Sequence, residues 1–282
     1  MMKNWRIHLS NLKLQTWTRG QILYKCSKSC SSEKREIAAY LLKHGVTFFP
    51  YRFQEKYEES HTAVLFDDEG YPYVIHNGKK LFLKKEWTVK KCQEYYVSLL
   101  REQDNDSPHK YLNKGRNPVY SDIAADLGAA EGIFGLDIIE DVQKIYLFEA
   151  DEGWKRPLEK TFAPWKDKAE VIWKYVGDKD TANMIKLDTF FENKQVTYLK
   201  ADIEGAEADM LSGGGITFTK KLRIALICVY HRQDAEQAVK NYLRKYGFAC
   251  SVNPGYVLFL YDKENFKPPY LRRCVMTGIK RM

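Results

Sequence analysis

Short apolar runs alternate with segments of helical periodicity through the second half of this sequence. Each run is long enough for one buried strand, and between the runs apolar residues recur at helical spacing. This alternation predicts a doubly wound, mostly parallel α/β sheet with helices on both faces. The predicted strands are 123–128, 145–150, 171–176, 196–202 and 223–230, with a short helix from Ala206 and a longer one over 234–247.

Two further strands are predicted at the end of the pattern, over 248–252 and 256–261. The segment Asn253-Pro254-Gly255 joins them, and it is too short for a crossover connection. We therefore expect a terminal antiparallel hairpin, which brings the sheet to seven strands.

The first 85 residues are mixed and rich in aromatic residues. A helix is predicted over 32–45, with Ser32 as its N-cap and Gly45 as its stop. Short strands follow over 62–85, and His76–Lys79 is typical of a hairpin turn. We expect a small basic α+β extension over 1–85 and a catalytic domain over 86–282, which opens with an amphipathic helix.

The charge of the chain is uneven. Its net charge is +8, and residues 1–60 hold eleven Lys and Arg against five Asp and Glu. A solvated basic face explains this, as does affinity for a phosphorylated sugar carrier, an acidic glycan or a membrane surface. The basic residues form neither a run nor a nucleic-acid reader motif, so we expect no nucleic-acid partner.

Cysteine spacing and hydropathy bear on the compartment. The six cysteines are scattered except for Cys26 and Cys30, and no second pair follows them at metal-site spacing. No segment has the length of a signal peptide's apolar core or the roughly 20 apolar residues of a membrane span. We expect a soluble cytoplasmic protein with reduced thiols and no integral membrane segment. Peripheral membrane contact stays open, and the pattern predicts no oligomeric state.

A glycine loop after the first strand of the alternation is the main candidate for ligand binding. Gly128 and Gly132 let the backbone turn sharply and approach a ligand closely, because neither carries a Cβ. The helix that follows would present its free N–H groups there. Glu149 ends the next strand, seventeen residues after Gly132, where an acid can accept both hydroxyls of a ribose.

The acids near this loop favour one nucleotide cofactor over another. A dinucleotide site needs G-x-G-x-x-G for its diphosphate, whereas this loop lacks the middle glycine and carries Glu131 near the helix start. Phosphate would be repelled there. S-adenosylmethionine has no phosphate, and it carries an α-amino group that an acidic loop can accept.

Several segments in a fixed order resemble FkbM-type methyltransferases, which belong to the Rossmann-like class I enzymes. The similarity runs from about Ser107 to Tyr261, and "DIEGAE" after the fourth strand is its most specific part. The matching segments are "ADLGAAEGIFGLDII", "IYLFEAD", "IKLDTFF", "LKADIEGAEADMLSGG" and "ICVYHR". The resemblance implies the strand order 3-2-1-4-5-7-6 with the seventh strand reversed.

What the resemblance implies about function is methyl transfer from S-adenosylmethionine to a hydroxyl of a carbohydrate-containing acceptor, such as a glycan or a glycosylated metabolite. Glu149 would hold the ribose hydroxyls, and Ala150 would lie beside the adenine. Asp178 is a candidate for the adenine amine, although a turn aspartate explains it equally well. The residues implied on the methionine and ribose side are Asp126, Gly128, Ala129 and Gly132.

Asp202 and His231 are the candidate catalytic residues, because each ends a long apolar strand, where a charged group needs a reason. Neutral His231 would act as general base, and Asp202 would orient it or bind the acceptor. Glu204 fits catalysis and a solvated acid equally. Glu207 is better explained as an acid in the first turn of a helix, and Ser107 and His109 as loop-capping residues. A divalent metal shared by Asp202 and His231 is the runner-up, because one carboxylate and one imidazole are a thin ligand set, and we expect no metal.

Two other functions stay open. The chain could bind S-adenosylmethionine as a regulatory protein without turnover, since an intact loop says nothing about transfer. It could also be another Rossmann enzyme, such as a nicotinamide-dependent oxidoreductase, which the missing middle glycine disfavours.

Overall fold

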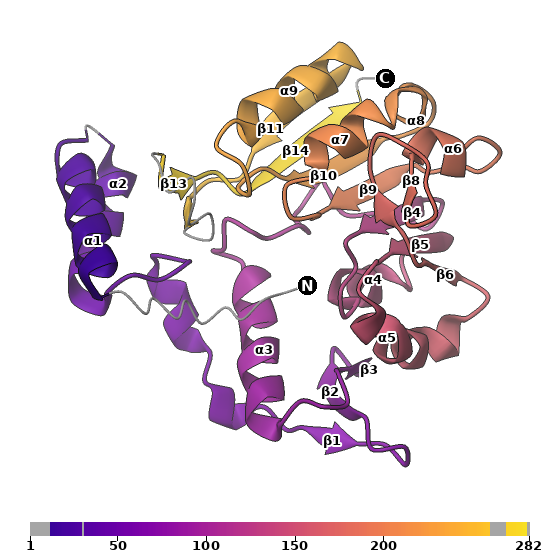
Figure 1. Cartoon of the computed structure of the whole chain (residues 1–282), viewed down its shortest axis with the longest axis horizontal. Helices are drawn as coiled ribbons and strands as arrows, with labels where there is room; N and C mark the ends of the chain where they lie inside the picture. Colours follow the sequence, from indigo (N-terminus) through magenta and orange to yellow (C-terminus); the bar gives the residue numbers. More distant parts are fainter. Residues whose placement is uncertain (1–11, 30, 260–268, 281–282) are drawn as a thin grey trace.

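The computed structural model describes residues 12–29, 31–259 and 269–280, and its centre is a seven-stranded sheet (Figure 1). The strands are β4 (Ile123–Leu127), β5 (Lys144–Phe148), β6 (Ala169–Ile172), β9 (Tyr198–Ala201), β10 (Ile224–Cys228), β11 (Phe248–Val252) and β14 (Val275–Lys280). Across the sheet their order is β11-β14-β10-β9-β4-β5-β6. Only β14 runs antiparallel to its neighbours within this sheet. The expected order, with a reversed seventh strand, is confirmed.

Helices cover both faces of the sheet, because successive side chains of each buried strand point to opposite faces. In β4, Ala124 packs into one apolar cluster and Ala125 into the other. The first cluster includes α4 (Ile133–Ile138) and α5 (Lys155–Phe162). The second includes α6 (Leu187–Phe190), α7 (Glu207–Ser212), α8 (Gly215–Thr219) and α9 (Ala235–Lys245). The doubly wound arrangement is therefore as expected.

The N-terminal part consists of two helices, a small sheet and a third helix. These are α1 (Leu12–Ser27), α2 (Ser32–His44), the short 3-10 turns η1 (Arg52–Lys56) and η2 (Glu59–His61), β1 (Leu65–Phe66), β2 (Pro72–His76), β3 (Lys79–Phe82) and α3 (Val89–Glu102). The predicted hairpin turn joins β2 to β3, with Asn77 and Gly78 in the left-handed conformation. Gly45 ends α2 as expected, but the N-cap is Ser31 and not Ser32, since the Ser31 hydroxyl accepts from Lys34 N.

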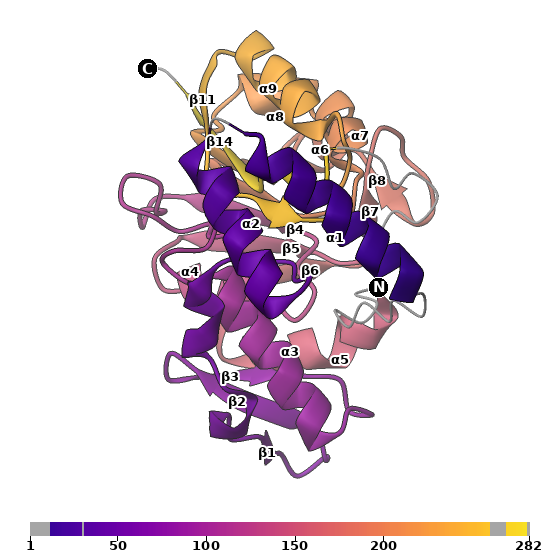
Figure 2. The same ribbon diagram turned by 90° about the vertical axis from the view of Figure 1, so that its left-hand side faces the viewer.

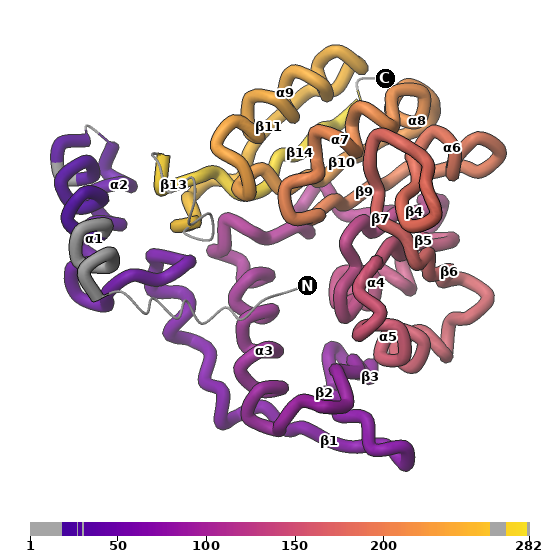
Figure 3. Tube along the Cα trace, in the orientation of Figure 1, coloured from indigo at the N-terminus to yellow at the C-terminus, as the bar shows by residue number. Residues whose placement is uncertain are grey.

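The path of this part brings α3 to the site. Figure 3 shows the chain running from α2 to β1 at the far end of the molecule, and α3 then returning toward the sheet. α1 and α2 lie together in front of the sheet in Figure 2. They pack on β12 (Val257–Leu258) and β13 (Leu271–Arg272) through a third apolar cluster.

The terminal antiparallel pair is present, but its second strand is not 256–261. β11 pairs with β14, whereas Val257 and Leu258 pair with β13 in a separate two-stranded sheet. The strand that pairs with β10 is covered on both faces of the sheet. β14 takes this position, and its residues Val275, Met276 and Thr277 are all buried. Residues 260 and 261 of the predicted strand lie outside the described residues.

The predicted strand 171–176 is interrupted. β6 ends at Ile172, and β7 (Tyr175–Val176) pairs instead with β8 (Met184–Ile185). Lys174 N donates to Ile172 O over 3.0 Å, which turns the chain away from the sheet edge. Two short 3-10 turns, η3 (Glu152–Trp154) and η4 (Ala163–Trp165), flank α5.

The division of the chain at residue 85 stays a prediction. Phe48, Val74 and Leu83 lie in the same apolar cluster as residues of β4 and β5. No helix in the described ranges is both long and apolar enough to cross a membrane. The five cysteines of those ranges are free thiols, and Cys30 lies outside them.

Candidate functional site

A cavity of about 230 Å³ opens at the carboxyl edge of the parallel strands. Parallel strands end at the same edge, so the residues that follow β4, β5 and β9 meet there. The cavity is lined by the glycine loop over 128–131, by 148–150, by 174–176, by 202–204 and by residues of α3. The interruption after β6 matters here, because it carries 174–176 across this edge.

The glycine loop packs directly on the end of β9. Gly128 has φ +75°, and a Cβ there would lie 2.0 Å from the backbone oxygen of Asp202. The backbone N–H groups of Gly128 and Ala129 both donate to Phe148 O, over 2.9 and 3.0 Å. The loop is thus fixed between β5 and β9, and only glycine fits its first position.

Glu149 is held in place by backbone donors. Its Oε1 accepts from Ala150 N and Asp151 N over 2.7 and 2.6 Å, and its Oε2 accepts from Ala130 N over 2.8 Å. These bonds fix the carboxylate at the rim of the glycine loop. The carboxylate keeps further lone pairs for hydroxyl donors in the cavity. Gly128, Ala129, Glu149 and Ala150 all line the cavity, so four of the predicted cofactor residues come together.

Asp126 lies beneath the loop instead of in the cavity. It is fully buried, and Lys200 Nζ donates to Asp126 Oδ1 and to Gly128 O, both over 2.9 Å. Burial opposes the charged ammonium, but the charges of Asp126 and Asp202 raise the pKa of Lys200 above its ordinary value. The ion pair therefore supports the loop from below.

Gly132 and Asp178 also lie away from the cavity lining. A Cβ on Gly132 would meet Phe162 Cε2 at 2.6 Å and Leu158 Cδ2 at 2.8 Å, so its missing side chain makes room for α5. Asp178 is exposed. A direct cofactor contact by either residue has no support in the geometry. Lys174, Tyr175 and Val176, which precede Asp178 in the chain, line the cavity.

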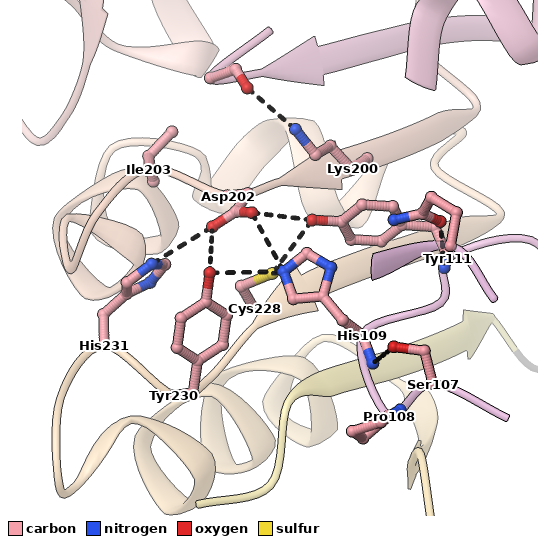
Figure 4. A network of polar contacts seen from close by, with 12 residues as sticks. Ser107, Pro108, His109, Tyr111, Lys200, Asp202, Ile203, Cys228, Tyr230 and His231 are labelled. Carbon is pink, nitrogen blue, oxygen red and sulfur yellow. Dashed lines mark hydrogen bonds and ion pairs between the residues drawn. The ribbon is translucent and has the colours of Figure 1, made fainter. Parts of the chain in front are cut away.

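Asp202 is the centre of a polar network at the cavity floor (Figure 4). Tyr111 Oη donates to its Oδ2 over 2.8 Å, and Tyr230 Oη donates to its Oδ1 over 3.4 Å. His109 Nε2 lies 3.4 Å from Oδ2, and His231 Nε2 lies 3.3 Å from Oδ1. Burial opposes its charge, but His109, His231 and Lys200 hold the pKa of Asp202 well below its usual range. It is therefore a charged acceptor.

His231 lies behind Asp202 and is oriented by Glu207. His231 Nδ1 is 2.9 Å from Glu207 Oε1, and the Glu207 side chain is only 1% exposed. The explanation of Glu207 as a solvated first-turn acid is therefore wrong. Burial disfavours the imidazolium, but the bond to Glu207 and the charge of Asp202 raise the pKa of His231 above its ordinary value. The predicted convergence of Asp202 and His231 is present.

Several residues of the site were not assigned to it from the sequence. Ser107 Oγ accepts from His109 N over 3.1 Å, as expected for a loop cap, but the His109 ring also joins the Asp202 network. Tyr111 sits in the same irregular segment, where periodicity gives no direction. Glu102 could have been found, because it interrupts the apolar face of α3.

Among the described residues, two groups of side chains share Asp202 and are close enough to hold a metal ion. One adds His109 and Cys228, and the other adds Glu207 and His231, with ligand atoms within 4.8 Å of one another in each. Each group offers three ligands. The expectation of no metal stays a prediction.

The central part of the chain is similar to a known protein family. Residues 127–250 match the family described as the methyltransferase FkbM domain. No curated protein sequence matches the chain.

Three solved structures are similar to parts of the chain. A methyltransferase FkbM from Methylobacillus flagellatus KT is 15% identical with a TM-score of 0.46, over 68% of this chain and 53% of that one. The chain therefore spans about half the length of that structure. A putative methyltransferase from Streptococcus mutans, solved in complex with SAH, is 15% identical with a TM-score of 0.38, over 58% and 91% of the two chains. A putative RNA methyltransferase from Pyrococcus horikoshii is 13% identical with a TM-score of 0.37, over 58% and 77%.

Proposed function

We propose that the protein is an S-adenosylmethionine-dependent O-methyltransferase, because residues 127–250 match the methyltransferase FkbM domain. Its acceptor would be a hydroxyl of a carbohydrate-containing molecule, such as a glycan or a glycosylated metabolite. The acceptor class rests on the family resemblance alone. A cytoplasmic location rests on the sequence.

The observation that carries the cofactor assignment is the fixed carboxylate of Glu149 beside a glycine loop in an acidic cavity. Glu149 can accept the ribose hydroxyls while the backbone holds it in place. Glu131, Asp202 and Glu204 also line the cavity, against the cations Lys174 and Lys200. S-adenosylmethionine fits this charge pattern, because it has a sulfonium, an ammonium and no phosphate. A dinucleotide diphosphate fits it poorly.

Not all of the predicted cofactor residues have the same role. Gly128, Ala129, Glu149 and Ala150 would contact the cofactor, since all four line the cavity. Asp126 and Gly132 would not contact the cofactor. Asp126 would support the glycine loop through Lys200, and Gly132 would do so by packing against α5.

The chemistry of transfer needs a hydroxyl held toward the cofactor and a group that takes its proton. When bound, S-adenosylmethionine supplies a methyl group on a positively charged sulfur. Asp202, a charged acceptor at the cavity floor, would orient the acceptor O–H. His231 Nε2, 3.3 Å from Asp202 Oδ1, would take the proton in its neutral form. Glu207 at Nδ1 would fix the tautomer that leaves Nε2 free to do so.

A turnover assay tests this proposal. The protein is incubated with S-adenosylmethionine and a panel of sugars, glycolipids and phenolic acceptors, and the product mass is recorded with and without a chelator. We expect one added methyl group on a sugar-containing acceptor and no effect of the chelator. Loss of activity with the chelator would instead support a metal at Asp202.

A thermal-shift comparison separates the alternatives. Stabilisation by S-adenosylhomocysteine without turnover on any acceptor would support the regulatory alternative. Stabilisation by a nicotinamide dinucleotide alone would contradict the cofactor assignment.

A further inference from the structure

Helix α3 forms one wall of the cofactor cavity, although it lies outside residues 127–250. Leu99, Glu102 and Gln103 line the cavity, and their spacing places them on one helical face. One turn earlier on this face, Tyr95 Oη donates to Glu131 Oε2. The helix therefore supplies one acid to the cavity and holds a second.

Glu102 is a buried acid of the cavity wall without a protein partner among the described residues. It is only 8% exposed, it lines the cavity, and its carboxyl group has no hydrogen bond or ion pair within the described ranges. A buried carboxyl group without a donor is costly, and such groups are nearly always satisfied in native proteins. Because Glu102 borders the cavity, its missing donor is expected to come from a ligand.

The charges around Glu102 show what kind of ligand this is. Its charged neighbours are Asp202, Glu131, Lys200 and Glu204. Lys200 is already engaged, since it donates to Asp126 and to Gly128 O. Burial, Asp202 and Glu131 hold the pKa of Glu102 well above its ordinary value. Within the described ranges, the one cation among these neighbours of Glu102 is therefore committed to other acceptors.

We propose that Glu102 binds the α-ammonium group of the methionine part of S-adenosylmethionine. This assignment rests on the proposed function. A sulfonium carries the required charge but has no N–H, whereas an ammonium offers three donors. Glu131 assists by its charge, because its Oε2 already accepts from Tyr95.

Calorimetry with three ligands tests the assignment. S-adenosylhomocysteine has the ammonium group, an analogue of it lacks only the α-amino group, and 5′-methylthioadenosine lacks the whole amino-acid tail. In Glu102→Gln we expect S-adenosylhomocysteine to bind about tenfold more weakly or worse, because a charge-assisted bond is lost. The affinity for 5′-methylthioadenosine should stay within about twofold, which also shows that the variant is folded. Glu86→Gln, an exposed acid outside the cavity lining, is the matched control and should change neither affinity.

The analogue without the α-amino group provides a second test, in which the wild type and the variant are compared. It should bind the analogue without the α-amino group about tenfold more weakly than S-adenosylhomocysteine, and Glu102→Gln should bind the two nearly equally. Equal weakening of all three ligands in Glu102→Gln, or no weakening of any, would overturn the assignment and leave the proposed function intact. A wild type that binds none of the three ligands would overturn both.

Discussion

A single carboxylate, Glu149, connects the glycine loop to the end of the second strand of the domain. Its three backbone donors come from Ala130, Ala150 and Asp151. Within the described ranges no side chain donates to it, so lone pairs of this cavity-lining carboxylate remain for a ligand. The fixed orientation of the Glu149 carboxylate is therefore as important for binding a ligand as its charge.

We expect Glu149→Ala to bind S-adenosylhomocysteine at least about tenfold more weakly. The variant loses hydrogen bonds from two hydroxyls to a charged group, each contributing about 1.5–3 kcal/mol at the upper end. Calorimetry measures the affinity, and Glu152→Ala, an exposed acid three residues on, is the control. An unchanged affinity in a folded Glu149→Ala variant would contradict the ribose assignment.

The raised pKa of His231 leads to a pH dependence of turnover. A general base must be neutral, and His231 is charged below its pKa, which lies above the ordinary value of 6.5. Turnover should therefore rise with pH through an apparent pKa above 6.5. His231→Gln should lower turnover by about 10²–10⁴ and remove this rise.

The control for His231→Gln is its affinity for S-adenosylhomocysteine, which should be retained because His231 is not part of the cavity lining. A rise in turnover with pH that persists in the variant would assign the titration to another group. Normal turnover of His231→Gln would exclude the proton-acceptor role.

At the scale of residues, sequence reasoning worked where strand ends dictate position. Glu149, Asp202 and His231 follow buried strands, and parallel strands bring such residues to one edge. It could not distinguish two roles for Gly132, because a glycine required for packing against α5 looks the same in sequence as one required for a ligand. Tyr111 and His109 lie in an irregular segment whose path only tertiary contacts define.

At the scale of elements, the glycine loop and the two helices around it behave as one packed unit. The side of Gly132 that lacks a Cβ faces Leu158 and Phe162 of α5, and its φ is +89°. From the sequence, this residue is assigned to the methionine and ribose side of the cofactor. The geometry makes it a contact between helices instead.

We therefore expect Gly132→Ala to destabilise the fold by about 1–3 kcal/mol, through overpacking against α5 and strain at positive φ. Urea unfolding measures the change. Gly115→Ala separates the two causes, because Gly115 has φ +84° but nothing within 4 Å of its Cβ position. Equal losses in the two variants would mean that backbone strain alone matters at Gly132.

The sheet order was predictable because the alternation of strands and helices leaves few topologies. The partner of β11 was not. The short turn over 253–255 favoured a local hairpin, but burial of Val275 and Met276 on opposite faces decides the pairing in favour of β14. The strand that pairs with β11 is therefore set by burial in the sheet interior and not by the local turn.

At the scale of the whole molecule, the apolar core of the described residues has three clusters, of which the first two flank the central sheet. The third joins α1 and α2 to Leu258 and Tyr270. None of its fully buried members lines the cofactor cavity. Stability of the helical pair and affinity for the cofactor should therefore be separable.

Leu41→Ala tests this separation. Leu41 is fully buried in the third cluster, so its truncation should cost about 2–5 kcal/mol of unfolding free energy. Leu42→Ala is the matched control on the same helix, since Leu42 is 60% exposed and should change stability by less than about 0.5 kcal/mol. The affinity of both variants for S-adenosylhomocysteine should stay within about twofold of the wild type, because the glycine loop and α3 pack in other clusters. A large loss of affinity in Leu41→Ala alone would show that the helical pair and the cavity are energetically coupled, and would argue against treating the first 85 residues as a separate unit.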